Sequence, residues 1–178
     1  LLEKNSLRLK DTFKVVPFKK KNITLIQTFD NKINEKLIIK SRNVTQRRFE
    51  LCGIKKFKEI IIPHKENILC EKIQICIDQN VDIILIIGSH AITHIKDVIP
   101  NAIKMSGAKI IRFGIPVEPG NLLLLSKFKS VKRDIYIIGM PSCAKSPKEN
   151  GLDWVLWRIL CNINLKNSNI NELSVGGL

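Results

Sequence analysis

A turn built from glycine, proline and small hydroxyl residues lies between an apolar run and a helix-like segment. It reads GMPSCAKSPKEN, residues 139–150, and it follows IYII and precedes GLDWVLWRIL. Its small residues let a backbone approach a ligand closely, and Lys145 and Lys148 add positive charge. Because the first amides of a helix lack partners inside the helix, a strand, a turn and a helix in this order commonly bind an anion. The candidate ligand-binding residues here are Pro141, Ser142, Ser146 and Lys148.

Two further loops follow apolar runs and carry residues of the same kinds. GSHAITHIKDVIP, residues 88–100, contains a carboxylate beside a lysine, and GIPVEPGNL, residues 114–122, contains a Pro-Gly turn with outward backbone N–H groups. None of the three loops matches a Walker P-loop or the G-x-G-x-x-G fingerprint, so a generic nucleotide site is not indicated. The ligand-binding residues expected in these two loops are Gly88, Ser89, Lys96, Asp97, Pro119, Gly120 and Asn121.

Several of these residues have a structural alternative. Asp97 stands directly before VIPNAI, where it would accept the first amide protons of a helix, so capping and a functional carboxylate fit the sequence equally. His90 and His94 have the spacing of metal ligands only within a helix, and we place them in a loop, so we assign no metal site. Lys145 and Lys148 would otherwise be solvated side chains.

The elements that must position these loops form an alternating pattern. Apolar runs alternate with longer segments of helical period, which predicts a largely parallel sheet covered by helices on both faces. In such a sheet, ligands bind beyond the carboxyl ends of the strands, where the three loops would meet. We expect strands at residues 22–28, 57–63, 81–88 and 109–115. We expect helices at residues 41–53, capped by Ser41 and stopped by Gly53, and at 66–80, 97–107 and 152–161.

The final third of the chain has a different pattern. NLLLL and IYIIGM flank the charged turn KFKSVKRD, which predicts an antiparallel hairpin. The predicted fold class is therefore α/β: a three-layer α/β/α sandwich with a mostly parallel mixed sheet and one antiparallel hairpin. Residues 1–21 lack this order and are interpreted as a linker or the end of a preceding domain, whereas 22–178 form the α/β domain. Because the chain begins at Leu1, we expect it to be part of a longer protein.

Composition limits the class of protein. At 178 residues the chain fits one ordinary domain. No apolar run approaches the roughly 18–20 residues of a membrane span, and no signal-peptide pattern opens the chain, so we expect a soluble cytoplasmic protein without a membrane partner. The five cysteines contain no C-x-x-C pair, which favours reduced core thiols. Cys143 is interpreted as a small turn residue rather than a nucleophile, because no histidine is placed locally to activate it.

The net charge of +14 raises the question of a nucleic-acid partner, since clustered Lys and Arg bind phosphate backbones. Here the lysines are scattered through the chain. The densest basic segment, residues 40–58, has few interleaved aromatic residues. A solvated basic face is therefore favoured over a nucleic-acid site.

The loop sequences resemble a known family. IIGSHAITHIKDVIPNAI, GIPVEPGNLLLL and GMPSCAKSPKENGLDWVLWRIL, in this order and spacing, look like the molybdopterin-binding domain of the molybdenum cofactor biosynthesis (MoaB/Mog-like) superfamily. They are most similar to the bacterial branch in which this domain is joined to a nucleotidyltransferase-like domain. The resemblance covers about residues 22–178. It implies an α/β/α sandwich that holds the phosphate of a pterin dithiolene in the loops at the strand ends.

The resemblance also implies roles for individual residues. Asp97 in KDVIP matches an acidic residue of an Arg-Asp-Val-Thr-Pro type segment, and so inherits the role of a catalytic or metal-assisting carboxylate. VEPGN occupies the place of a Pro-Gly-Lys-Pro turn, and GMPSCAKSP that of a Leu-Pro-Gly-Asn-Pro turn. The chain departs from the family at residues 88–91, where Gly-Ser-His-Ala replaces Gly-Gly-Thr-Gly or Gly-Gly-Val-Ser, and at Asn121, which replaces the lysine.

Three functions remain open at this point. The preferred hypothesis is a module that binds molybdopterin in cofactor biosynthesis and presents it to a neighbouring nucleotidyltransferase-like domain. A catalytic alternative is adenylyl transfer to molybdopterin, with Asp97 helping to position Mg²⁺ and Lys148 balancing charge on a nucleotide phosphate, or molybdate insertion. The third is a non-enzymatic basic domain that binds RNA or an acidic protein. A homo-oligomer stays an open alternative in each case.

Overall fold

Strands of one mixed sheet occupy the centre of the computed structural model, which describes residues 15–131 and 133–174. Within these residues the sheet has six strands in the order β2-β1-β3-β6-β5-β4. β2, β1, β3 and β6 pair in parallel, and β5 is antiparallel to both of its neighbours. The strands are β1 (Ile23–Phe29), β2 (Lys58–Pro63), β3 (Ile83–Ile87), β4 (Lys109–Phe113), β5 (Leu124–Lys129) and β6 (Asp134–Gly139).

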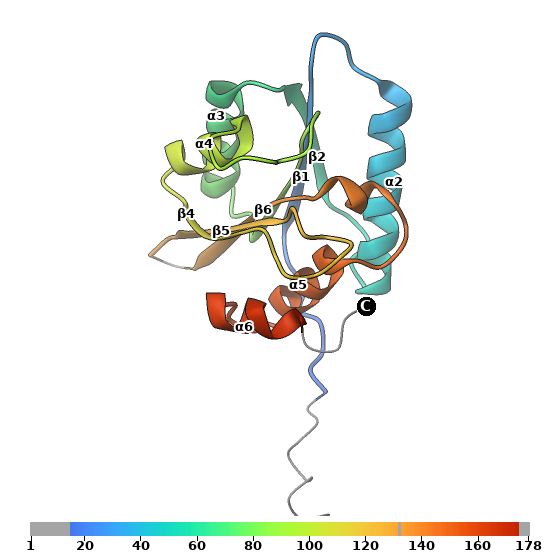
Figure 1. Ribbon diagram of the computed structural model, residues 1–178, viewed down its shortest axis with the longest axis vertical. Helices are drawn as coiled ribbons and strands as arrows, with labels where there is room; N and C mark the ends of the chain where they lie inside the picture. Colours follow the sequence, from blue (N-terminus) through green and yellow to red (C-terminus); the bar gives the residue numbers. More distant parts are fainter. Residues whose placement is uncertain (1–14, 132, 175–178) are drawn as a thin grey trace, which may run out of the picture.

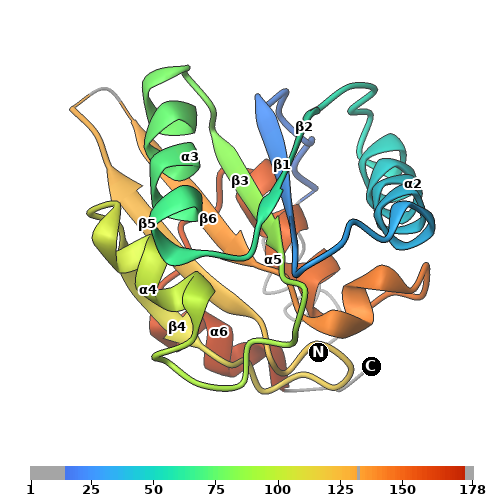
Figure 2. The same cartoon turned by 90° about the horizontal axis from the view of Figure 1, so that it is seen from above.

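Helices cover both faces of this sheet (Figures 1 and 2). α2, α5 and α6 pack on one face, and α3 and α4 pack on the other, each group over its own hydrophobic core. The predicted three-layer α/β/α sandwich with a mostly parallel mixed sheet is therefore confirmed. The helices are α2 (Glu35–Leu51), α3 (Glu66–Asp78), α4 (Val98–Met105), α5 (Gly151–Leu160) and α6 (Asn167–Asn171), with 3₁₀ turns η1 (Ser142–Lys145) and η2 (Glu172–Ser174).

The central strand shows why the sequence gives this architecture. β3 reads IILII, and all five residues are buried. A strand covered on both faces has no solvent-facing side, so it needs a continuous apolar run rather than alternation. Its side chains divide between the two cores: Ile83, Leu85 and Ile87 point to the α2/α5/α6 side, and Ile84 and Ile86 to the α3/α4 side.

The first helix begins earlier than predicted. Its N-cap is Asn34, whose side-chain oxygen accepts the Leu37 N–H at 3.1 Å. The prediction that Ser41 caps this helix is wrong, because Ser41 is a buried residue inside α2. The lysines and isoleucines from residue 35 onward allow a helix, and the asparagine before them satisfies its first amides. Gly53 follows the helix end with φ +74°, as predicted for a stop signal.

The hairpin is present, but its turn is shorter than predicted. Much of KFKSVKRD belongs to the strands, since Lys127, Phe128 and Lys129 pair with Tyr136, Ile135 and Asp134. The connection closes with the Ser130 N–H bonded to the Arg133 carbonyl at 2.9 Å. Charged side chains on these strands mimic a polar turn in the sequence. α6 and η2 were not predicted, although they bury Ile170 and Leu173 in the core beside α5.

The chain enters the fold at the edge of the sheet where the parallel strands begin. The Lys19 N–H bonds the Leu160 carbonyl at 2.8 Å, and the Cys161 thiol lies 3.5 Å from the Val16 carbonyl. Of the predicted linker and domain, residues 1–14, 132 and 175–178 lie outside the described residues. No helix in the described part of the chain is long and apolar enough to cross a bilayer.

Candidate functional site

The parallel strands bring their carboxyl ends to one edge of the sheet. Asp30 follows β1, His64 follows β2, Gly88 follows β3 and Met140 follows β6. Gly139 closes this edge tightly, because a Cβ there would lie 2.5 Å from the Ile92 side chain. The loop after β3 therefore rests directly on the end of β6. Numbered along the chain, the predicted loops are residues 88–100, 114–122 and 139–150, and the first and third of them are in contact.

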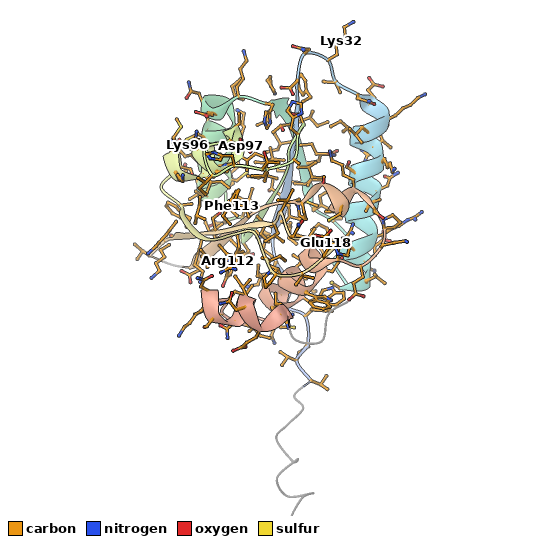
Figure 3. The ribbon with its side chains drawn as sticks, in the orientation of Figure 1. Lys32, Lys96, Asp97, Arg112, Phe113 and Glu118 are labelled. Carbon is orange, nitrogen blue, oxygen red and sulfur yellow. The ribbon has the colours of Figure 1, made fainter. Side chains whose placement is uncertain are left out.

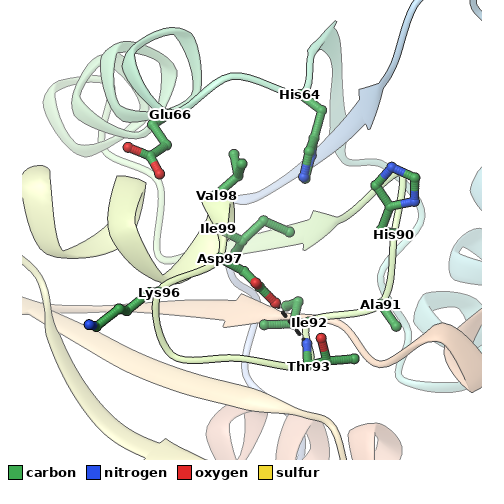
Figure 4. Close-up of a pocket in the computed structure, with 10 residues that line it drawn as sticks. All are labelled: His64, Glu66, His90, Ala91, Ile92, Thr93, Lys96, Asp97, Val98 and Ile99. Atoms are coloured by element: carbon green, nitrogen blue, oxygen red, sulfur yellow. Dashed lines mark hydrogen bonds between the residues drawn. The ribbon is translucent and has the colours of Figure 1, made fainter.

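A pocket of about 400 Å³ lies at this edge (Figure 4). The loop after β3 forms one wall, and the first turns of α3 and α4 and the end of β2 form the others. Lys96 and Asp97, two of the predicted ligand-binding residues, line it. The full lining is His64, Glu66, His90, Ala91, Ile92, Thr93, Lys96, Asp97, Val98 and Ile99.

Asp97 occupies the N-cap position of α4 but does not cap that helix with its side chain. Its Oδ2 instead accepts the backbone N–H groups of Thr93 and His94, each at 2.8 Å. The alternative that the Asp97 side chain caps α4 is therefore wrong. The two amides that bond its carboxylate belong to the turn before the helix, and Pro100 in the first turn of α4 has no amide hydrogen to donate. The hydrogen bond from His94, then that from Thr93, lowers the pKa of Asp97 from 3.8. The carboxylate is ionised at neutral pH.

A carboxylate–imidazole contact that the sequence analysis missed lies next to the pocket. Asp30 Oδ2 is 2.5 Å from His90 Nε2. The Ser89 hydroxyl is the largest cause of a lowered pKa of Asp30, and the two histidines contribute. His64 packs edge-on against His90 with ring centroids 5.9 Å apart. Asp30 stands in a run of turn-forming residues, so only the strand order of the sheet shows that it meets the loop after β3.

His64 was also missed, and it links β1 and β2 beneath the pocket. Its Nδ1 is 2.7 Å from Thr28 Oγ1, and the Ser89 N–H donates to the same hydroxyl at 3.0 Å. Burial lowers the pKa of His64 from 6.5, against the opposing effect of Asp30. His64 is therefore mostly neutral at pH 7. A single histidine after IIIP gives no sequence signal for this role.

The third loop carries a half-buried lysine. Lys145, at the end of η1, has its Nζ 3.4 Å from the Gly88 carbonyl oxygen. Burial lowers its pKa from 10.5. No acidic side chain in the described part of the chain forms an ion pair with it. Burial raises the pKa of the Cys143 thiol in the same loop, which disfavours the nucleophilic thiolate at neutral pH.

A buried arginine holds the backbone of this loop. Arg48 Nε bonds Asp153 Oδ1 at 2.8 Å, and Nη1 bonds the Ala144 carbonyl at 2.9 Å. Nη2 bonds the carbonyls of Ser146 and Lys148 at 2.7 and 3.1 Å. Burial is the main cause of a raised pKa of Asp153, although Arg48 and the Asn150 N–H act against it. Arg48 lies about 100 residues from its partners in sequence, so no local pattern indicated it.

The second loop packs on α5 rather than on the pocket. Gly151 N–H donates to the Pro119 carbonyl at 2.9 Å, and the Glu118–Pro119 peptide is cis. Gly120 has φ +129°, and a Cβ there would lie 2.7 Å from the Gly151 nitrogen. In Figure 3, Glu118 is well separated from Lys96 and Asp97. The second loop therefore touches the third loop's end but does not line the pocket.

The predicted residues thus fall into four groups. Lys96 and Asp97 line the pocket. Gly88, Ser89, Pro141 and Ser142 follow β3 and β6 at the carboxyl edge of the sheet, where Pro141 is buried and Ser142 is exposed. Ser146 and Lys148 lie against α2, because Arg48 donates to both of their carbonyls, and Lys148 is exposed. Pro119 and Gly120 contact the start of α5, and Asn121 lies in the same loop.

Three basic residues of the dense segment 40–58 have separate partners. Arg42 pairs with Glu59 at 3.5 Å, and Arg48 is buried on Asp153. The Lys58 ammonium donates to the Gln79 side chain at 2.8 Å. These three charges therefore do not lie together, whereas Lys40 and Arg47 line one shallow pocket on α2.

A known structure shares this fold. The tungsten cofactor synthesizing protein MoaB from Pyrococcus furiosus matches with a TM-score of 0.54 and 13% identity, over 86% of this chain and 99% of that one. The protein CinA with unknown function from Thermoplasma acidophilum matches with a TM-score of 0.39 and 12% identity, over 81% and 98%. The first likeness supports the α/β architecture. No family model matches the chain, and no curated protein matches it.

Proposed function

We propose that this chain is a module that binds molybdopterin, a phosphorylated pterin, in the biosynthesis of a molybdenum or tungsten cofactor. The loop phrases of the sequence and the MoaB-like fold both favour this proposal. The ligand would lie at the edge where β1, β2, β3 and β6 end. In a longer protein, a neighbouring nucleotidyltransferase-like domain would be the partner that receives it.

The observation that carries the proposal is Lys145. A lysine normally keeps its ammonium group in water or pairs it with an acid. Lys145 is half-buried in the loop after β6, beside the loop after β3, and within residues 15–131 and 133–174 its only hydrogen bond is to the Gly88 carbonyl at 3.4 Å. Its lowered pKa reflects desolvation without compensation. A phosphate at this position would supply the missing negative charge.

The adjoining pocket has room for the heteroaromatic part of such a ligand. Its volume of about 400 Å³ falls in the lower range of small-molecule sites. Ile92 and Ile99 supply apolar surface, whereas Lys96 supplies a second positive charge. Phosphate bound near Lys145 and a ring bound in the pocket would be neighbours, because the same loop, residues 88–97, borders both.

Calorimetry with molybdopterin tests the proposal directly. Lys145→Gln removes the charge, and we expect binding to weaken about tenfold or more, as for loss of one charge-assisted hydrogen bond. Lys129→Gln is the matched control, because Lys129 pairs with Asp134 at the start of β6, away from the edge where β6 ends. This variant should bind molybdopterin as the unchanged protein does. No heat and no thermal shift with saturating molybdopterin would contradict the proposed function.

A second candidate is Mg²⁺-dependent adenylyl transfer to the bound pterin, and the ionised Asp97 favours it. Mg²⁺ takes one or two carboxylates together with phosphate oxygens, and Asp97 and Glu66 line the same pocket. Asp97 would hold the ion together with phosphate oxygens, and the ion would neutralise charge on the transferring phosphate. Asp97→Asn should then abolish ATP consumption while molybdopterin still binds. If the unchanged protein consumes no ATP with Mg²⁺ and molybdopterin present, binding alone is its function.

A further inference from the structure

A buried hydroxyl beneath the pocket has three polar neighbours. Thr28 Oγ1 accepts the Ser89 N–H at 3.0 Å, lies 3.3 Å from the Ile87 carbonyl oxygen, and lies 2.7 Å from His64 Nδ1. Thr28 is only 4% exposed, so water does not replace these partners. The direction of each hydrogen bond therefore follows from the donors and acceptors present.

A hydroxyl has one proton and two lone pairs. The Ile87 carbonyl can only accept, so it takes the Thr28 proton, and the Ser89 amide can only donate, so it takes one lone pair. Satisfying the third contact requires His64 Nδ1 to donate its proton to the second lone pair. In a neutral imidazole with Nδ1 protonated, Nε2 carries a free lone pair.

The second nitrogen of His64 faces the pocket. No hydrogen bond within the described chain involves Nε2, and this atom is not among the buried polar atoms that lack a partner, so it is open to a ligand. Figure 4 shows the His64 ring on the wall opposite Thr93, between Glu66 and His90. The nitrogen is thus a hydrogen-bond acceptor at the pocket surface.

We propose that His64 Nε2 accepts a hydrogen bond from a ring N–H or amino group of the ligand and so selects a nitrogen-rich heteroaromatic ring. This inference rests on the proposed function, because pterins carry such donors. The other polar groups of the pocket fit the same ligand: Glu66 and Asp97 are further acceptors, whereas Lys96 is its one lysine. A donor-rich ring edge would face the acceptors, and the phosphate would face Lys145.

The protonation of His64 supplies a pH signature. The titratable groups that act on it are Asp30 from the end of β1 and His90 and Asp97 from the loop after β3, and Glu66 from α3 and Lys96 line the same pocket. Asp30 and Asp97 have lowered pKa values, so both stay charged as the pH falls from 7 toward 5. Protonation of His64, whose pKa lies below 6.5, removes the lone pair. Binding of an N–H donor should therefore weaken as the pH falls through the pKa of His64.

Long-range ¹H–¹⁵N correlation spectra of the labelled protein test the tautomer without any ligand. We expect a protonated Nδ1 and an unprotonated Nε2 for His64 at a pH of about 7.5, well above its reference pKa. Thr28→Val removes the hydroxyl at nearly constant shape and should mix the two tautomers. Thr24→Val, also buried on β1, is the control and should leave the His64 signals unchanged. A protonated Nε2 in the unchanged protein overturns the inference.

Calorimetry with neopterin monophosphate, a stable phosphorylated pterin, tests the contact. We expect His64→Leu to weaken binding about tenfold, whereas His64→Gln, which can present an oxygen at the same place, should retain most of it. As the pH falls, affinity should drop more steeply in the unchanged protein and in His90→Gln than in His64→Gln, in which the phosphate of the ligand still titrates but residue 64 does not. If the pterin binds equally well to His64→Leu, the inference fails while the proposed function stands. If no pterin phosphate binds the unchanged protein, the proposed function fails, and the assigned ligand fails with it.

Discussion

At the scale of single residues, the site contains charged side chains that are paired with an opposite charge and one lysine that is not. Arg48 and Asp153 are both about 6% exposed and satisfy each other, and Arg48 also bonds three carbonyls of the loop. Lys145, which follows Ala144 in the same loop, forms no ion pair with any acid in the described residues. The contrast separates a residue that shapes the loop from one that is available to a ligand.

Arg48→Met should destabilise the protein strongly. The substitution leaves the Asp153 carboxylate buried without its partner, which typically costs about 3–5 kcal/mol. Arg42→Met is the matched control, because Arg42 is 46% exposed and its pair with Glu59 spans 3.5 Å, so its loss should cost under about 1 kcal/mol. Urea denaturation near neutral pH measures both changes. Equal losses in the two variants would show that Arg48 has no special structural role.

At the scale of elements, the sequence indicated most of the architecture because β-strands that are buried on both faces leave a clear mark. IILII in β3 is continuous and apolar, and it was placed correctly. The start of α2 was misplaced because Ser41 and Asn34 are both good caps, and only packing decides between them. The partners of Asp97 and Arg48 could not be predicted, since they depend on turn geometry and on contacts between distant elements.

Gly120 fixes the second loop against α5, and substitution should reveal this. Gly120→Ala places a methyl group 2.7 Å from the Gly151 nitrogen at a φ of +129°. Gly53→Ala is the control, because its φ is +74° but no atom lies within 4 Å of the added carbon. We expect about 1 kcal/mol of destabilisation for Gly53→Ala and a clearly larger loss for Gly120→Ala. Thermal denaturation of both variants measures the difference, and equal losses would exclude the backbone contact as its cause.

At the scale of the whole molecule, the net charge of +14 is an excess of one sign. Arg42, Arg48 and Lys58 of the basic segment 40–58 have three different partners. An excess of one sign acts as general self-repulsion, which opposes the compact state. The structure therefore gives the charge a physical effect without requiring a nucleic-acid partner.

Salt should stabilise the protein for this reason. Raising NaCl from about 20 mM to about 200 mM shortens the screening length from roughly 20 Å to below 10 Å and weakens repulsion between exposed lysines. We expect the urea midpoint to rise over this range. A midpoint that falls instead would mean that attractive ion pairs outweigh the repulsion.

Double-stranded DNA added at low salt is a separate check. Binding that Lys40→Gln and Lys55→Gln remove would support the hypothesis of a basic interaction domain.

The entry of the chain has a practical consequence for measurement. Val15–Lys21 meets the fold beside Leu160 and Cys161, where the parallel strands start, whereas the pocket lies where they end (Figure 1). A sensor chip that captures the protein through its N-terminal segment would hold it with the pocket on the side away from the chip surface. Immobilisation from that side should leave the approach of small analytes unobstructed.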